Sequence, residues 1–173
     1  MNTLIFTNAP WIHFLKISEH VQHLHHSCVK YNIITESQFP NLKSYRFRNF
    51  RHCNVNEANE FPMVEKLDIE IAHFNIPYLN GLLKRIEHTL RGLSIFVLSH
   101  DEINENMALE LNQFLSKYKP NQLDSLQIQT VTDDLILDAM MGQAESLTTL
   151  TITTHQTTQE AFLLIEKCVN LVD

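Results

Sequence analysis

A short apolar phrase recurs along this chain, and it restricts the fold more than any other feature of the sequence. Each copy reads as leucine or a related residue, two residues, leucine, one residue, isoleucine. The first positions of successive copies are 30, 22, 26, 33 and 24 residues apart. These are the lengths of chain that one strand and one helix require. Recurrence at such intervals is typical of repeat proteins. The six copies are Ile12, Leu15 and Ile17; Leu42, Tyr45 and Phe47; Val64, Leu67 and Ile69; Leu90, Leu93 and Ile95; Leu123, Leu126 and Ile128; and Leu147, Leu150 and Ile152.

The spacing within each copy predicts a strand with one buried face. Side chains alternate between the two faces of a strand, so the second and third apolar positions point to the same side. A single copy has nothing of its own against which to bury that side, whereas stacked copies form a parallel sheet with a continuous core. We therefore expect an α/β fold, a leucine-rich-repeat-like solenoid with a curved parallel sheet and return helices.

Between the predicted strands the apolar period lengthens toward 3.6 residues, as return helices require. Residues 48–60 show no clear pattern. In the last predicted helix, Thr157 followed by Glu160 fits a capping box. The predicted helices are 76–88, 107–118, 158–169, a segment from Asp133 to Met141, and 18–29. The face of 158–169 that we expect to be buried comprises Ala161, Leu164, Ile165 and Cys168.

No change of composition divides the chain, so we expect residues 1–173 to form a single leucine-rich-repeat-like domain. Leu171 stands 24 residues beyond Leu147, where a further copy of the phrase would begin. This position suggests that the chain is a fragment of a longer repeat array. Cys168, Leu171 and Val172 are then expected to be partly exposed, because terminal repeats leave an unfinished edge.

Composition argues against several classes of function. The chain contains three Gly and has no glycine-rich phosphate loop, so we expect no nucleotide cofactor. A net charge of −7 argues against nucleic-acid binding. Neither a signal peptide nor an apolar run of membrane-spanning length is visible, which predicts no membrane association. Three widely spaced cysteines, Cys28, Cys53 and Cys168, fit a reducing compartment, the cytoplasm or the nucleus.

Two clusters offer alternatives to this simple interpretation. His20, His23, His25 and His26 lie close together with Glu19 and Cys28, which are donors that zinc accepts, but no second ligand pair follows at a recognised spacing. The basic stretch 43–51 carries three arginines between aromatic residues and suits phosphate or an acidic peptide. Alternation along a strand explains the same stretch as core aromatics with outward arginines. We predict neither a metal site nor catalytic residues.

Residues that alternate with the core positions must face outward on the sheet. They form a stripe that runs from basic through acidic to polar, with Phe96 near its middle. Phe96 is either an exposed anchor for a partner or a side chain tucked under neighbouring structure. The predicted partner-binding residues are Arg46, Arg48, Asp68, Glu70, Ser94, Phe96, Gln127, Gln129, Thr151 and Thr153.

Several segments resemble the irregular leucine-rich repeats of F-box proteins. They include Phe-Pro-Asn-Leu-Lys-Ser-Tyr-Arg-Phe (39–47), Ser-Leu-Thr-Thr-Leu-Thr-Ile (146–152), Leu-Ile-Glu-Lys-Cys-Val-Asn-Leu (164–171), and the helix, proline-bearing turn and strand of 114–128. The resemblance implies a receptor that holds a protein substrate on its concave sheet for ubiquitination by a Skp-cullin ligase. The adaptor of that ligase would bind only a region outside this chain, because no F-box is visible here.

The sequence departs from regular leucine-rich repeats in one respect. Three residues beyond the third apolar position, regular repeats place Asn or Cys, whereas this chain has His20, Phe50, Ala72, Leu98, Val131 and His155. The leading prediction is a protein-binding module that recognises the substrate of an SCF-type ubiquitin ligase. The alternative is a leucine-rich scaffold or effector protein unrelated to ubiquitin, and an enzyme ranks third.

Overall fold

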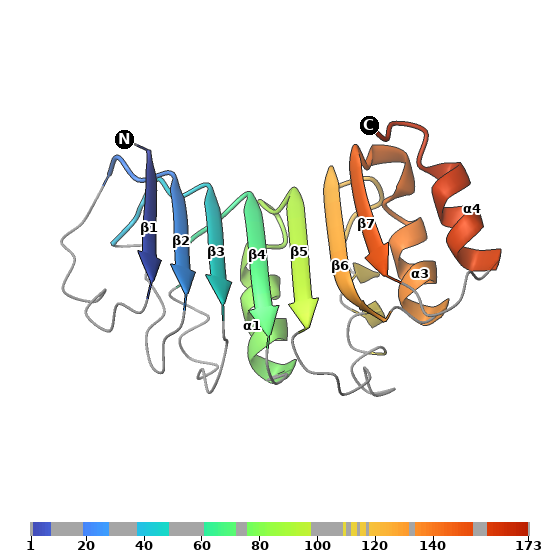
Figure 1. The fold of residues 1–173 in the computed structure, drawn as a ribbon, viewed down its shortest axis with the longest axis horizontal. Helices are drawn as coiled ribbons and strands as arrows, with labels where there is room; N and C mark the ends of the chain where they lie inside the picture. The colour runs from blue at the N-terminus through green and yellow to red at the C-terminus, as the bar shows by residue number, and fades with distance from the viewer. Residues whose placement is uncertain are drawn as a thin grey trace. The chain divides into compact units, whose positions relative to one another are not determined.

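The chain forms two compact units, Met1–Leu90 and Arg91–Asp173, each of which is described by itself. A computed structural model provides the structure (Figure 1). It describes residues 2–7, 19–27, 38–48, 61–71, 76–97, 109, 112–113, 115–116, 118–131, 134–153 and 159–172.

The described residues of the first unit form four strands that pair in chain order, all of them parallel. A helix follows these strands (Figure 1). The strands are β1 (Thr3–Thr7), β2 (His23–Ser27), β3 (Ser44–Arg48) and β4 (Lys66–Ile71), and the helix is α1 (Ile76–Ile86).

Where the structure describes the second unit, it has three strands, which also pair in chain order and in parallel. Helices α3 and α4 pack against each other (Figure 1). The strands are β5 (Gly92–Val97), β6 (Ser125–Val131) and β7 (Thr149–Thr153); the helices are α3 (Asp134–Met141), the short 3-10 helix η3 (Ala144–Ser146) and α4 (Gln159–Lys167). The α/β class and the parallel strands are as the sequence predicted.

The register places matching positions of the apolar phrase beside one another. In the first unit Tyr45 pairs with Leu67, and Phe47 pairs with Ile69. All four side chains are buried, together with Phe61, whose ring lies 5.4 Å from that of Tyr45. In the second unit the middle positions Leu93, Leu126 and Leu150 pair across three strands, as do the third positions Ile95, Ile128 and Ile152.

The last described strand is less well covered than the phrase predicts. Leu93 and Leu126 are fully buried, but Leu150 is only half-buried. Ile152 is half-buried too. Among the described strands β7 pairs with β6 alone, so one flank of its apolar side chains has no neighbouring strand.

A recurring pair of backbone hydrogen bonds fixes the start of each strand. One carbonyl oxygen near the start of a strand accepts two consecutive amides from the next strand of the same unit. The accepting residues are Asn2, Gln22 and Lys43 in the first unit and Arg91 and Asp124 in the second. At the end of the chain the Val172 amide donates in the same way to the Thr148 carbonyl, at 3.0 Å.

Side-chain amides reinforce two of these strand starts. Asn41 donates its Nδ2 to the carbonyl oxygen of Glu19 at 2.9 Å, and Asn170 donates its Nδ2 to that of Glu145 at 2.6 Å. Each asparagine stands immediately before the first apolar position of a copy, at Leu42 and at Leu171. These two side-chain hydrogen bonds therefore join successive copies at the beginning of the strands.

Hydroxyl groups occupy the same position in two further copies. Thr89, immediately before Leu90, donates its Oγ1 to the carbonyl oxygen of Val64 at 3.0 Å. Ser146, immediately before Leu147, donates its Oγ to the carbonyl oxygen of Leu123. The residue type varies from copy to copy. In each of these four cases, however, the side chain donates a hydrogen bond to a backbone carbonyl oxygen at the start of the preceding copy.

The buried amide of Gln143 connects η3 to the turn that precedes β6. Its Oε1 accepts the backbone amides of Gln122 and Leu123, both at 2.9 Å, and its Nε2 donates to the Lys119 carbonyl at 3.0 Å. Gln143 is almost completely buried. The three bonds satisfy backbone groups that the turn would otherwise leave without partners in the protein interior.

One predicted helix is wrong. Residues 18–29 were expected to be helical, but 23–27 form strand β2. Val21 and Leu24, both buried, stand three residues apart, which fits one side of a helix and also the first two positions of the strand phrase. His26 occupies the third position, so the phrase is not recognisable there. The copy at Ile12, Leu15 and Ile17 lies outside the described residues.

The other helix predictions are largely confirmed where residues are described. Helix α1 matches 76–88, and α3 begins at Asp134 as expected. Of 107–118 only some positions are described, among them buried Leu115 and Tyr118. Helix α4 matches 158–169, although its capping residue Thr157 lies outside the described residues.

Two predictions about the last helix need correction. Ile165 is half-exposed rather than buried, because Ala161, Leu164 and Cys168 follow a spacing of three and four residues that places Ile165 on a neighbouring side. For the same reason Cys168, expected to be partly exposed, is buried with Ala161 and Leu164. Leu171 and Val172 are exposed, as predicted.

Candidate protein-interaction surface

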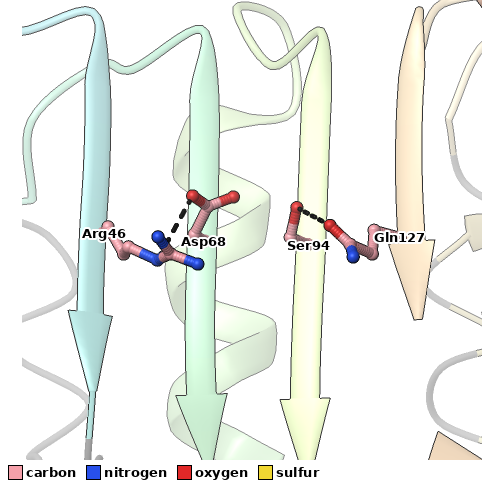
Figure 2. A network of polar contacts seen from close by, with 4 residues as sticks. All are labelled: Arg46, Asp68, Ser94 and Gln127. Atoms are coloured by element: carbon pink, nitrogen blue, oxygen red, sulfur yellow. Dashed lines mark hydrogen bonds and ion pairs between the residues drawn. The ribbon is translucent and has the colours of Figure 1, made fainter. Parts of the chain in front are cut away.

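In the first unit, one transverse row of outward-facing residues crosses the described strands β1 to β4. The register aligns Ile5, His25, Arg46 and Asp68 as neighbours on β1, β2, β3 and β4. Arg46 Nε lies 3.7 Å from Asp68 Oδ2, and Figure 2 shows these two side chains directed toward each other. The side chains are 40% and 35% exposed. This ion pair is therefore accessible from the surface.

Further polar groups lie on both sides of that row. His23, Ser44 and Lys66 are aligned toward the start of the strands, and His23 and Lys66 are exposed. Arg48 and Glu70 are aligned toward their ends. Glu70 is half-buried, and the side chain of Arg48 lies outside the described residues. The face carries positive and negative groups on adjacent strands, with the apolar core beneath them.

In the second unit, the corresponding row is neutral. The register aligns Ser94, Gln127 and Thr151 on β5, β6 and β7. Ser94 Oγ donates to Gln127 Oε1 at 3.5 Å, a long hydrogen bond that Figure 2 shows. Ser94 is buried although it was predicted to be a contact residue, because Gln127 and the neighbouring strand cover its small side chain. Gln127 and Thr151 remain half-exposed.

Phe96, Gln129 and Thr153, which lie toward the ends of the strands, deviate from the predicted arrangement. Phe96 is half-buried, which lies between the two predicted alternatives, and it pairs with Gln129, whose side chain is outside the described residues. Thr153 is exposed but pairs with Val131, because the register shifts between Ile128 and Val131. The expected row of Gln129 and Thr153 therefore does not form.

The predicted surface is brought together within each unit. Arg46, Asp68 and Glu70 are neighbours in the first unit, and Ser94, Gln127 and Thr151 are neighbours in the second. The prediction missed the outward residues of β1 and β2, namely Ile5, His23 and His25, and also Lys66. The signal for β2 was the alternation of histidine with Leu24, which was interpreted as part of a helix.

This surface offers ion pairing and hydrogen bonding. Among the described residues, no three His, Cys, Asp or Glu side chains form a group that could hold a metal ion. Cys168 is buried in the second unit, and its burial raises the pKa of the thiol above its ordinary value. A raised pKa disfavours the thiolate form that a nucleophile requires.

No protein-family model, curated protein or solved structure matches this chain. Within the parts of the chain that the structure describes, no helix is both long enough and apolar enough to cross a lipid bilayer. The structural class supported by the geometry is an α/β protein with parallel strands.

Proposed function

We propose that this chain is a protein-binding module with a leucine-rich-repeat-like solenoid fold, and that a partner docks on the outward face of its strands. The observation that carries the proposal is the row of Arg46 and Asp68 on adjacent strands, partly exposed above a closely packed apolar core. Stacked strands offer a wide surface for recognition without a deep pocket.

The energetics of this ion pair support a role in recognition. An exposed pair of opposite charges contributes little to folding, since solvent screens it and both side chains lose freedom. When a partner supplies a carboxylate or a cation, Arg46 or Asp68 can pair with that group instead of with each other. Charged groups on such a surface chiefly set the rate and the specificity of association.

The half-buried ring of Phe96 is the apolar element of the proposed surface in the second unit. Aromatic side chains, phenylalanine among them, are enriched in protein interfaces relative to the rest of the surface. We assign Phe96, Gln127 and Thr151 to contacts with the partner in this unit. Arg46, Asp68 and Glu70 make the contacts in the first.

The resemblance to F-box leucine-rich-repeat proteins supports a narrower proposal. The partner would then be a protein destined for ubiquitination, and the Skp-cullin adaptor would bind through a region outside this chain. We place such a receptor in the cytoplasm or the nucleus. The alternative remains a leucine-rich scaffold or effector unconnected with ubiquitin, and catalysis is not part of the proposal.

Capture of partners by variants of the chain tests the docking surface. Asp68→Lys combined with Glu70→Lys, and separately Phe96→Ala, should preserve the circular dichroism spectrum and weaken the capture of a specific partner by about tenfold. Asp138→Lys, at an exposed position of α3, is the control for charge, and Met63→Ala, at an exposed position that precedes β4, is the control for lost apolar surface.

Two outcomes would argue against the proposal. If the outward-face variants capture the partner as well as the native chain does, the docking surface lies elsewhere. If the control variants lose the partner to the same extent as the outward-face variants do, the loss is not specific to this face. Copurification of Skp-cullin components with the protein that carries this chain distinguishes the ubiquitin-ligase receptor from the scaffold.

A further inference from the structure

Strand β1 forms an open edge of the first unit (Figure 1). Among the described residues it pairs with β2 alone. The carbonyl oxygen of Asn2 accepts the amides of Gln22 and His23 on the β2 side, both at 2.9 Å. Backbone groups alternate in direction along a strand, so those of Leu4 also point toward β2, whereas those of Ile5 point toward the open edge. The edge therefore presents backbone donors and acceptors to a further strand.

Side chains on both faces of β1 are less covered than their neighbours in the register. Leu4 occupies an inward position and is half-buried, whereas Leu24, aligned with it on β2, is buried. On the outward face Ile5 is 62% exposed, in a row whose other members are polar. A strand added at this edge would shield Leu4 on one face and Ile5 on the other.

Strand β1 lacks the devices with which proteins usually protect a sheet edge. Charged side chains, proline and bulges are common there, but Thr3–Thr7 reads Thr-Leu-Ile-Phe-Thr, and no Lys, Arg, Asp or Glu precedes Lys16. The first unit has nine Lys and Arg against eight Asp and Glu, whereas the second has four against twelve. Two first units can therefore approach each other without strong electrostatic repulsion.

The sequence of β1 is nearly symmetric about Ile5. Threonine stands at both ends, and an apolar residue stands on each side of the centre. In an antiparallel pair of β1 strands with Ile5 opposite Ile5, Thr3 of each copy lies opposite Thr7 of the other, and Leu4 lies opposite Phe6. The backbone groups of Thr3, Ile5 and Thr7 point to the open edge, so each of their pairs can exchange two hydrogen bonds. The strand is thus complementary to itself.

We propose that two copies of this chain associate through antiparallel pairing of their β1 strands, centred on Ile5. A twofold axis relates the two edges, so the contact closes as a dimer and does not propagate. The pairing is a case of strand addition, in which backbone hydrogen bonds supply much of the affinity. Each side contributes a strand of 5 residues, so the interface is small and the dimer should dissociate on dilution. This association does not depend on the docking surface proposed above.

Sedimentation velocity of the purified chain over a wide range of concentrations tests the proposal. The native chain should show a monomer–dimer equilibrium. Ile5→Lys should weaken dimerisation about tenfold or more, because it places two like charges directly opposite each other at the twofold axis. The circular dichroism spectrum should not change, since the position is exposed in the monomer. Ile165→Lys, the same substitution at a half-exposed position of α4, is the matched control and should leave the equilibrium unchanged.

Disulfide trapping gives a second readout, which reports the register. In a chain with Cys28→Ser and Cys53→Ser, Ile5→Cys should form a covalent dimer on mild oxidation, because Cα atoms in a hydrogen-bonded antiparallel pair lie about 5.5 Å apart, within disulfide reach. Thr3→Cys alone should not, because the two copies of this position would lie about 14 Å apart along the strands. A mixture of Thr3→Cys and Thr7→Cys chains should form the mixed disulfide.

A native chain that is monomeric at every concentration overturns the proposal. So does a dimer that Ile5→Lys leaves intact, or one that Ile165→Lys weakens to the same extent. Equal trapping by Thr3→Cys and Ile5→Cys would exclude the antiparallel register and with it the proposal. If Ile5→Lys does not fold, the trapping experiment decides. Pairing of β1 solely with a strand of a different protein also overturns the proposal.

Discussion

Asn41 and Asn170 make the same hydrogen bond although they lie in different units of the chain. Each side-chain amide donates to a carbonyl oxygen in the turn before the preceding copy of the phrase, that of Glu19 for Asn41 and that of Glu145 for Asn170. The bond joins consecutive copies at the point where each strand starts. It therefore helps to fix the register on which the alternation of core and outward residues depends.

Removing this interaction should have a measurable cost. We expect Asn41→Ala to lower the free energy of unfolding by about 1 kcal/mol, the usual contribution of a side-chain hydrogen bond to backbone. Asn41→Asp keeps the size of the side chain but removes the donor, so it should be destabilising to a similar or greater extent. Urea unfolding measures both variants. Equal stability of the native chain and both variants would show that the bond contributes nothing.

Gln143 should be more sensitive than Asn41, because its amide is buried and makes three hydrogen bonds. Gln143→Leu preserves most of the side-chain volume but leaves two backbone amides and one carbonyl without these partners. We expect a loss of roughly 2 to 4 kcal/mol in unfolding free energy, since each unsatisfied buried group has a desolvation cost. Denaturant unfolding of the variant measures it, with Gln159→Leu, at an exposed position of α4, as the control.

The three middle leucines of the second unit should rank by burial. Leu93→Ala and Leu126→Ala remove fully buried side chains and should cost roughly 2 to 5 kcal/mol each. Leu150→Ala should cost less, because that side chain is half-buried on the last described strand. Thermal and chemical unfolding of the three variants gives the order. A loss below about 0.5 kcal/mol for all three, the range of surface substitutions, would contradict the strand register.

The sequence predicted those parts of the fold in which local pattern and burial agree. In β3 to β6 the phrase identifies the inward residues correctly, because alternation on a strand depends only on the period of the backbone. The pairing of Arg46 with Asp68 follows from the same alternation, once neighbouring copies are aligned by their apolar positions. This part of the candidate surface was accessible to prediction from sequence alone.

Other features depend on interactions that single-sequence patterns do not encode. Strand β2 was missed because His26 stands where the phrase expects an apolar residue, and a spacing of three also suits a helix. The register shift between Ile128 and Val131 has no marker in composition, yet it separates Thr153 from Gln129. The burial of Ser94 depends on the neighbouring Gln127 side chain. In each case tertiary packing decides between alternatives that are locally equivalent.

Cys168 should react slowly with alkylating reagents in the folded protein. Burial removes the thiol from solvent and raises its pKa, so little thiolate is present near neutral pH. In a chain with Cys28→Ser and Cys53→Ser, iodoacetamide should modify Cys168 much faster after unfolding than before. Mass spectrometry follows the reaction. Equal rates in the folded and unfolded chains would show that the thiol is accessible.

The same pKa shift predicts a dependence of stability on pH. The unfolded thiol, with a pKa of about 8.5, ionises at lower pH than the folded one. As pH rises past that value the unfolded state gains thiolate first, so the contribution of Cys168 to stability is complete below it and declines above it. Cys168→Ala should remove this part of the decline. Unfolding curves of both chains from neutral to alkaline pH provide the comparison.

Asp68 should matter for recognition far more than for folding. Its side chain and that of Arg46 are both more than one third exposed and lie 3.7 Å apart, so solvent screens the pair and its contribution to stability should stay below about 1 kcal/mol. Asp68→Asn removes the carboxylate charge beside Arg46 with almost no change of shape. We therefore expect a nearly unchanged unfolding free energy but an altered partner affinity that varies strongly with salt concentration. Titration calorimetry at low and high salt measures the affinity, and urea unfolding measures the stability. A large loss of stability with unchanged affinity would assign the Arg46–Asp68 pair to the fold and remove it from the docking surface.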